Sequence, residues 1–578
     1  METVSFAHPF ITERLMGAVH QVDGTSVEVT LPRAGAPVSS AFGERIALGE
    51  IGEFVVIDVG GVGIFGRLLE IHTPLKELQN VTADTELGGL HASGQVQLLS
   101  TLNLDGTYTR GVLRHPRVGD QVYSASDEVL AAIVAGVSHS EDGTADVMVN
   151  MGVLSTGDGV AVSISASKLF GRHLAVLGAT GAGKSWTLAH IIEEVAARHG
   201  RLILVDATGE FHSLAGIARH LSLGVTVDQP ASSTQVCLPH FEFSEADRNA
   251  FLRPSGGSQL PKLRAAIRSL RLANVLGESH AIVEHGLITK AGRERRTIIQ
   301  EERNHAAVLE DARAQFALEK LPEQIARECV FEHDRNDSSK YGDYSNNDIA
   351  YCNSLIARVH DMLQTDVIAE VVNPTSATPS VLAEIDRWAS DSTAEPILRI
   401  SLKNLAFSHY IREIVVNTVG RFLLTNARSG SYVNSPLIVA VDEAHQFFGQ
   451  TIGDEFTSAN LDSFESIAKE GRKYALTVCM ATQRPGDLPA AVLSQAGMMI
   501  VHRLADKRDR ERVEQASTEL DQSATKLLPS LIPGEGLLVG ADFPVPLPIR
   551  VTPPTRKPSS KGPDYGRWAS TPVATVVS

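Results

Sequence analysis

The pattern of apolar and polar positions along the chain first indicates a β-rich N-terminal region. From residue 1 to about 160, short apolar stretches alternate with turn residues, at 25–32, 53–61, 63–71, 96–103 and 114–126. Strands at this spacing, separated by Gly and Pro, are typical of a small barrel or sandwich. Within the last stretch, GVLRHPRVGDQVY predicts a strand, a turn and another strand, with Arg114 and Arg117 as solvated turn residues.

From Gly171 onward, apolar strands alternate with amphipathic helices. HLAVLG (173–178) predicts a buried strand, KSWTLAHIIEEVAARHG (184–200) a helix, and RLILVDATGEF (201–211) the next strand and its loop. This alternation predicts a mostly parallel, doubly wound α/β sheet. The same pattern returns later, with strands predicted at 396–405, 436–445, 475–482 and 497–504 and a helix at 411–428.

Between about 240 and 390 the pattern is helical and interrupts the α/β sequence. LPKLRAAIRSLRLANVL (260–276) and RNHAAVLEDARAQFALEKL (303–321) each predict a helix, and together they indicate a helical insertion. The polar stretch 333–350 predicts a surface loop or mobile connector. The C-terminal segment that begins FPVPLPIR is too rich in Pro for a helix, so we expect an extended strap followed by a disordered tail.

Composition places the chain in a broad class and excludes little else. The 578 residues are 43% hydrophobic and 21% charged, which is typical of a soluble protein with several domains. Without an N-terminal signal or a long apolar run, we expect a cytoplasmic protein with no membrane segment. The four cysteines form no CxxC pair and indicate reduced thiols. The net charge of −16 does not exclude DNA, because a ring can line its pore with Lys and Arg.

The strongest chemical motif is GATGAGKS at 178–185, which matches G-x-x-x-x-G-K-[ST]. A buried strand precedes it and a helix follows it, as a phosphate-binding loop requires. Its glycines allow the backbone N–H groups to surround phosphates, Lys184 is predicted to bind the β- and γ-phosphates, and Ser185 to ligate Mg²⁺. The predicted site for ATP and Mg²⁺ comprises Gly178, Ala179, Thr180, Gly181, Ala182, Gly183, Lys184, Ser185 and the next residue, Trp186.

An acidic pair follows a second apolar strand, in LIVAVDEAH (437–445). Asp442 emerges at the carboxyl end of that strand, where it is expected to hold Mg²⁺. Glu443 is the predicted general base that polarises the attacking water. For His445, a structural or coupling role is as well supported as a catalytic one.

Two further polar positions flank the strand predicted at 475–482. Gln483, in MATQRPGDL, follows this strand and is placed to sense the γ-phosphate, although a simple turn before Pro485 is the alternative. Arg472, in EGRKYA, precedes the strand. Its guanidinium either caps a helix end or reaches the nucleotide of a neighbouring subunit as an arginine finger, and spacing alone does not decide between these roles.

Taken together, six ordered motifs resemble the HerA branch of the HerA/FtsK ATPases. They are GRHLAVLGATGAGKS, DATGEF (206–211), VDEAH, AKEGRKY, ATQRPGDL and GEGLLVG (534–540). The resemblance implies a RecA-like doubly wound sheet with a small N-terminal β-barrel and a helical-bundle insertion. It also implies a division into a barrel (1–160), a core (161–240 and 393–540), an insertion (241–392) and a C-terminal brace and tail (541–578).

The same resemblance implies a homohexamer with double-stranded DNA in its central pore. By position, Arg472 matches the arginine finger that acts on the ATP of a neighbour. Arg172 matches a second basic residue at the subunit interface, with a strand-edge salt bridge as the alternative. The strap near Arg550 is expected to brace an adjacent subunit, and Glu210 is left without a role.

The insertion is longer than in the archaeal pattern, which puts the usual NurA-type nuclease partner in doubt. Longer bacterial relatives resemble the motor subunit of anti-phage defence complexes. The resemblance therefore implies a partner nuclease or sirtuin-like NAD hydrolase docked on the barrel, with an ATP-gated assembly platform or DNA-end resection as alternatives. A secretion or conjugation ATPase is a weaker rival. The basic clusters Lys262, Arg264, Arg268, Arg271 and Lys290, Arg293, Arg295, Arg296 are read as solvated helix faces.

Overall fold

The computed structural model describes most of the chain in two compact units, which we treat separately. The described residues are 8–32, 39–41, 44–46, 49–72, 92–103, 108–138, 147–156, 159–224, 226, 228–311, 313–374, 378–453, 458–517, 520, 522–540 and 543–559. The first unit comprises 1–200, 435–445 and 467–554, and the second comprises 201–434, 446–466 and 555–578. The predicted C-terminal tail beyond residue 559 lies outside the described residues.

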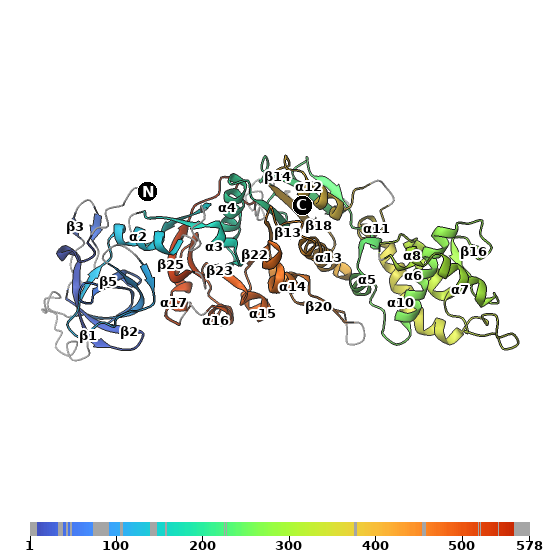
Figure 1. Cartoon of the computed structure of the whole chain (residues 1–578), viewed down its shortest axis with the longest axis horizontal. Coiled ribbons are helices and arrows are strands. Elements are labelled where there is room, and N and C mark those ends of the chain that lie inside the picture. Colours follow the sequence, from blue (N-terminus) through green and yellow to red (C-terminus); the bar gives the residue numbers. More distant parts are fainter. Residues whose placement is uncertain are drawn as a thin grey trace, which may run out of the picture. The chain divides into compact units, whose positions relative to one another are not determined.

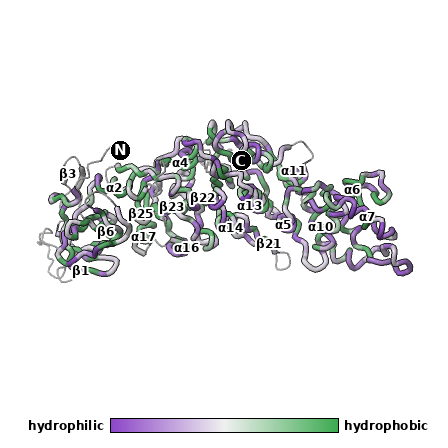
Figure 2. Tube along the Cα trace, viewed as in Figure 1, coloured by the Kyte–Doolittle hydropathy of each residue, from purple (hydrophilic) through white to green (hydrophobic). Residues whose placement is uncertain are grey.

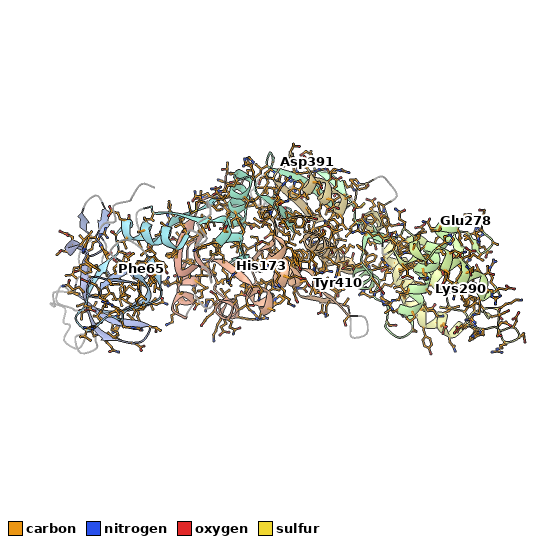
Figure 3. All side chains as sticks on the ribbon, in the orientation of Figure 1. Phe65, His173, Glu278, Lys290, Asp391 and Tyr410 are labelled. Carbon is orange, nitrogen blue, oxygen red and sulfur yellow. The ribbon has the colours of Figure 1, made fainter. Side chains whose placement is uncertain are left out.

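Six of the described strands in the first unit close into an antiparallel barrel, drawn in blue in Figure 1. They are β1 (Leu15–Val22), β2 (Ser26–Leu31), β5 (Phe54–Asp58), β6 (Gly63–His72), β7 (Ala92–Leu102) and β9 (Gln121–Ser124). Pairing of β2 with β7 closes the ring. Apolar side chains such as Val55, Ile57 and Ile64 fill it. On the opposite face of β5 and β6, Phe65, labelled in Figure 3, stacks on Phe54 with ring centroids 5.0 Å apart. The predicted small N-terminal barrel is therefore confirmed.

The strand–turn–strand predicted at 111–123 is wrong in its first half. Only β9 forms there, and residues 111–120 form turns. Gly111 and Gly119 adopt φ values of 81° and 99°, which favour turns over strands, and Pro116 cannot donate a backbone hydrogen bond. After β9 comes a helix that the sequence pattern did not reveal, α2 (Asp127–Ser138).

The α/β part of the first unit is a sheet that is antiparallel over one part and parallel over the other. Its strands run in the order β11 (Ala161–Ser165), β10 (Met148–Leu154), β25 (Phe543–Val551), β24 (Glu535–Gly540), β23 (Ala496–Val501), β12 (His173–Leu177), β22 (Leu476–Thr482) and β19 (Leu437–Val441). The sheet is antiparallel from β11 to β23 and parallel from β23 to β19. β12 pairs in parallel with both β22 and β23, and β22 with β19. The helix α4 (Lys184–Ala197) follows β12.

The C-terminal strap proves to be a strand of this sheet. β25 pairs with β24 over most of its length and with β10 through Ile549–Val551. Its prolines, Pro544, Pro546 and Pro548, occupy every second position, so the missing N–H groups all face one side of the strand. Pairing with β10 begins only after the last proline, which explains how so Pro-rich a segment enters a sheet.

The second unit contains four parallel strands among its described residues, β13 (Arg201–Asp206), β18 (Ile397–Asn404), β14 (Ala218–Gly224) and β15 (Thr234–Val236). The helices around them include α12 (Val381–Ser390) and α13 (Ile411–Arg428). Arg399, on β18, is fully buried and forms ion pairs with Asp206 at 2.8 Å and Asp228 at 2.7 Å. A charge this deeply buried requires such partners, so the network fixes the register of the strands.

The helical insertion of the second unit runs from α5 (Glu245–Leu252) to α11 (Asp366–Val372). Its other helices are α6 (Gln259–Leu276), α7 (Arg295–Asn304), α8 (Ala306–Glu310), α9 (Leu321–Arg327) and α10 (Asn346–Gln364). Figure 2 shows α7 as mainly hydrophilic (purple), whereas β6 of the barrel is mainly hydrophobic (green). Lys290, labelled in Figure 3, is buried in the insertion and contacts Glu328 at 2.6 Å.

Two expectations about the insertion are corrected by the structure. The single helix predicted at 303–321 is wrong, because α7 ends at Asn304 and α9 begins at Leu321 with a proline in its first turn. The stretch 333–350 is only partly a loop. Antiparallel bridges join Glu294 to Lys340 and Val330 to Tyr344, and Ser345 caps α10 by accepting a hydrogen bond from the N–H of Asp348.

Candidate active site

The loop between β12 and α4 has the backbone geometry of a phosphate-binding loop. All five residues of β12 are buried, and α4 begins at Lys184. Gly181 and Gly183 adopt φ values of 75° and 116°, which other residues rarely adopt. A Cβ on Gly178 would lie 2.6 Å from the Cβ of His502, so this position also requires glycine. The loop thus presents backbone N–H groups at a helix N-terminus, which favours an anion.

Lys184 reaches from this loop to the acidic pair. Its Nζ lies 2.9 Å from Oδ1 of Asp442 and 3.4 Å from Oε1 of Glu443. Burial alone would lower the pKa of Lys184, but the two carboxylates outweigh it and raise the pKa above its ordinary value. The lysine is therefore fully charged at neutral pH, and the P-loop and the acidic pair form one site.

Glu443 adopts a strained backbone at the end of β19, with a φ of 51°. Left-handed conformations of non-glycine residues concentrate at functional sites. His445 contacts it, with Nδ1 at 3.3 Å from Oε2 of Glu443 and at 3.0 Å from Oγ1 of Thr482. Burial, followed by the charge of Arg484, lowers the pKa of His445. The imidazole is therefore neutral at pH 7 and orients the Glu443 carboxylate without neutralising it.

Gln483 touches the phosphate-binding loop directly. The hydroxyl of Thr180, within that loop, donates a hydrogen bond to Oε1 of Gln483. Because Gln483 follows the last residue of β22, this contact links the loop to the neighbouring strand. A change in loop conformation on loss of the γ-phosphate would therefore be transmitted to β22.

His502 is a structural support of the site that the sequence interpretation missed. It follows β23, is fully buried, and its Nδ1 donates to the carbonyl of Glu535 at 2.6 Å. Its Nε2 accepts a hydrogen bond from Oγ1 of Thr187, in the first turn of α4, at 2.9 Å. Burial lowers its pKa to about 4, so the ring is neutral. A histidine directly after an apolar strand, in GMMIVHRL, is the signal that would have found it.

The donor set of the site fits ATP and Mg²⁺. Loop N–H groups and Lys184 suit phosphate oxygens, and the Ser185 hydroxyl and the Asp442 carboxylate are oxygen ligands of the kind that Mg²⁺ prefers. When bound, the metal would neutralise charge that develops on the phosphates. Trp186 is exposed on the first turn of α4.

Arg172 and Arg472 lie at the opposite edge of the same strands. Arg172 directly precedes β12, whereas the phosphate-binding loop directly follows it; six residue steps along a strand span about 20 Å. Arg472 lies in the 3₁₀ turn η7 (Gly471–Tyr474), which precedes β22. Neither arginine therefore reaches the loop of its own chain.

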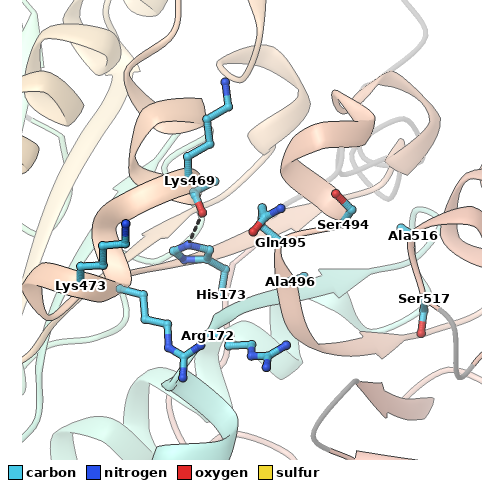
Figure 4. Close-up of a pocket in the computed structure, with 11 residues that line it drawn as sticks. Arg172, His173, Lys469, Lys473, Ser494, Gln495, Ala496, Ala516 and Ser517 are labelled. Atoms are coloured by element: carbon cyan, nitrogen blue, oxygen red, sulfur yellow. Dashed lines mark hydrogen bonds between the residues drawn. The ribbon is translucent and has the colours of Figure 1, made fainter.

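The two arginines share a cavity of about 380 Å³ that Figure 4 shows in close-up. Its cationic lining residues are Arg172, Lys469, Arg472 and Lys473, and its other lining residues are His173, Ala468, Ser494, Gln495, Ala496, Ala516 and Ser517. Among the residues that the structure describes, no carboxylate lines it. Within the described ranges, the side chains of Lys469, Arg472 and Lys473 form no ion pair.

The remaining candidates lie in the second unit. Asp206 accepts hydrogen bonds from the backbone N–H groups of Gly209 and Phe211, which shapes the DATGEF loop around Glu210. Most members of the two basic clusters have partners inside the insertion: Lys262 pairs with Asp348, Arg264 with Glu245, Arg268 with Glu302 and Glu310, Lys290 with Glu328, and Arg295 with Glu332. These charges stabilise the insertion itself.

Fold and site together define an ATPase of the P-loop class with a RecA-like core. Comparison with known proteins agrees: residues 149–350 match the family model for the central domain of the helicase HerA. Over this segment the chain is similar to the HerA helicases. Within the described residues, no helix is long and apolar enough to cross a membrane.

Similar proteins span most of the chain at low identity. A probable helicase of Methanocaldococcus jannaschii is 24% identical over 527 residues, covering 87% of this chain and 86% of the relative. The DNA double-strand break repair helicase HerA of Saccharolobus solfataricus is 24% identical and covers 78% and 76%. Among solved structures, the bacterial conjugative coupling protein TrwBdeltaN70 is 16% identical, covers 75% of this chain and 95% of its own, and has a TM-score of 0.40.

Proposed function

We propose that this protein is an ATP-driven translocase or helicase of double-stranded DNA that works as a homohexamer. The observation that supports this proposal is that the predicted catalytic groups lie at two separate edges of the parallel strands. Lys184, Asp442 and Glu443 meet at one edge of the parallel strands, and Arg172 and Arg472 lie at the other. We call the edge that carries Arg172 and Arg472 the arginine edge. In a ring, the arginine edge of one copy faces the phosphate-binding loop of the next copy, and every site is complete.

The residues then have distinct roles in hydrolysis. Lys184 and the loop N–H groups hold the triphosphate, while Ser185 and Asp442 hold Mg²⁺. Glu443, oriented by neutral His445, accepts a proton from the attacking water. Arg472 of a neighbouring copy stabilises the charge that develops on the γ-phosphate, with Arg172 beside it. Gln483 reports the state of the loop to β22 and so couples hydrolysis to movement.

DNA is proposed as the substrate because curated relatives that cover most of the chain are described as DNA double-strand break repair helicases. The net charge of −16 is compatible with DNA inside a ring whose outer surface is acidic. We further propose that a partner nuclease or NAD-consuming effector docks on the barrel, in anti-phage defence. In the alternative, ATP turnover gates the effector without moving DNA.

The test is ATP turnover by the purified protein with and without duplex DNA, combined with displacement of a protein block from one duplex end. We expect duplex DNA to stimulate turnover and ATP to drive displacement. A Glu443→Gln variant should bind ATP yet do neither. Turnover that ignores DNA and responds only to a co-purified effector would replace the motor with the platform. Undiminished turnover by Glu443→Gln would refute the assigned site.

A further inference from the structure

His173 is buried directly beneath the arginine edge and connects three elements. It is the first residue of β12, and only 3% of its surface is exposed. Its Nε2 lies 2.9 Å from the carbonyl oxygen of Ala468, near the end of α14 (Ser463–Glu470). The dashed line in Figure 4 marks this bond. Its Nδ1 lies 3.1 Å from the backbone N of Val478, in β22.

These two partners determine the protonation state of the ring. The Val478 N–H only donates, so Nδ1 must carry the lone pair. The Ala468 carbonyl only accepts, so Nε2 must carry the proton. An imidazolium would place an N–H against the N–H of Val478 and break that bond. His173 is thus a neutral imidazole in a single tautomer.

The charges that face His173 act in the same direction. Arg172 precedes it on β12, Lys469 comes from α14, and Arg472 and Lys473 come from η7. The lining residues Ser494, Gln495 and Ala496 on the β23 side bring no charge. Burial, and then the positive charge of Arg472, lowers the pKa of His173. The ring therefore bridges α14 and β22 throughout the neutral pH range.

The turn that carries Arg472 is otherwise anchored by its backbone alone. A Cβ on Gly471 would lie 2.6 Å from the carbonyl oxygen of Leu476, so the turn is tight. Ala475 closes it in a left-handed conformation, with a φ of 56°. The Arg472 side chain is exposed and has no ion pair in the described part of the chain. Its direction therefore depends on where the end of α14 and the start of β22 are held.

Arg172 is held by the same strand. A Cβ on Gly497, in β23, would overlap the Cβ, Cγ and Cδ atoms of Arg172, so the arginine stem lies against that glycine. His173 is the next residue along β12. Its two hydrogen bonds thus tie the backbone beside Arg172 to the segment that carries Arg472.

We propose that His173 is a positioning residue for catalysis in the neighbouring copy, because it locks α14 and β22 to β12 and so presents Arg472 beside Arg172. This inference rests on the proposed function, in which the arginine edge acts on another copy's ATP. It assigns to His173 no contact with nucleotide.

The test compares His173→Gln with a control histidine. Gln retains a donor for Ala468 but provides no ring acceptor for Val478. We expect ATP affinity to stay within twofold of wild type and kcat to fall by about 10- to 100-fold, because a displacement near 1 Å at a catalytic group has such an effect. The matched control is His190→Gln. His190 is also buried in the first unit and bonds Asn150 at 2.7 Å, away from the cavity, so kcat should change less than threefold.

Mixing separates action on a neighbour from action on the chain's own site. His173→Gln copies keep an intact phosphate-binding loop and Glu443, and Glu443→Gln copies keep an intact arginine edge. A one-to-one mixture should turn over ATP faster than the average of the two variants measured alone. A mixture that stays at the average, or a His173→Gln kcat equal to that of His190→Gln, overturns the proposal.

A second mixture distinguishes a refuted role of His173 from a failure of the proposed function. Arg472→Ala copies combined with Glu443→Gln copies test the neighbour-directed arginine itself. If that mixture recovers activity while the His173→Gln mixture does not, only the role of His173 is refuted. If neither mixture recovers, the arrangement of sites between copies is refuted as well. Thermal unfolding of each variant identifies any that do not fold.

Discussion

The two edges of the parallel strands in the first unit differ in whether their charged side chains are paired. At the carboxyl ends, Lys184 is paired with Asp442 and Glu443, and buried His502 supports the helix behind it. At the amino ends, Lys469, Arg472 and Lys473 surround a cavity that no carboxylate of the described part of the chain lines. The first edge satisfies its charges within the chain. The second leaves cations available for an anion from outside, which is the physical basis of the proposed sharing of active sites between copies.

The largest effect is expected from removing a cation at the amino ends of the parallel strands. Arg472→Ala should lower ATP turnover about a thousandfold, the usual contribution of an arginine finger, while ATP binding persists. Steady-state hydrolysis and binding of a fluorescent ATP analogue measure the two quantities. Lys507→Ala, which removes a cation that is 81% exposed, is the control and should leave turnover unchanged. Near-normal turnover in Arg472→Ala would remove the functional distinction between the edges.

The next largest effect is a pH dependence of stability, caused by His502 near the carboxyl ends of the strands. The pKa of His502 is about 4 when folded and near 6.5 when unfolded, so its neutral form stabilises the fold above pH 6.5. That contribution, about 3 kcal/mol, is lost as the pH falls from 6.5 to 4. Replacing His502 with Asn should therefore flatten the fall of the unfolding midpoint over this range. Parallel curves for the two proteins would contradict the assignment.

A pair of lysine substitutions sharpens the contrast in stability. Lys184→Ala leaves Asp442 buried without its partner and should cost about 2–3 kcal/mol, at or below the usual range for a broken buried pair. Lys469→Ala removes an unpaired cation from a repulsive cluster and should change stability by less than about 0.5 kcal/mol. Hydrogen exchange of backbone amides in α4 and α14 measures both effects. Equal losses would show that the two edges do not differ.

The smallest effect tests communication from the loop to β22. Gln483→Ala removes the hydrogen bond from Thr180 and should reduce DNA-stimulated turnover about fivefold, in keeping with about 1 kcal/mol for one such bond. Basal turnover should change less. Gln300→Ala, which removes one exposed hydrogen bond in the insertion, is the matched control. If both variants lose stimulation alike, Gln483 has no special coupling role.

Local sequence signals predicted much of the core but not its irregular parts. The strands at 173–178 and 475–482 and the helix at 411–428 correspond to β12, β22 and α13. Their apolar runs are long enough to specify the element without tertiary help. The single helix predicted at 303–321 is wrong because apolar spacing does not reveal the breaks on either side of α8. The prolines of the C-terminal segment predict an extended chain but not that β25 joins the sheet, because one of its two partners, β10, lies far away in sequence.

Sequence alone predicted which residues are suited to bind and hydrolyse ATP. GATGAGKS and the Asp442–Glu443 pair carry their chemistry in residue type and local spacing, and adjacent apolar strands place them at one edge. Only the tertiary structure decided that Arg172 and Arg472 meet at the other edge, and that His173 and His502 each adopt one tautomer. Those facts depend on hydrogen bonds between segments about 300 residues apart, because a histidine's role is set by what faces its two nitrogens.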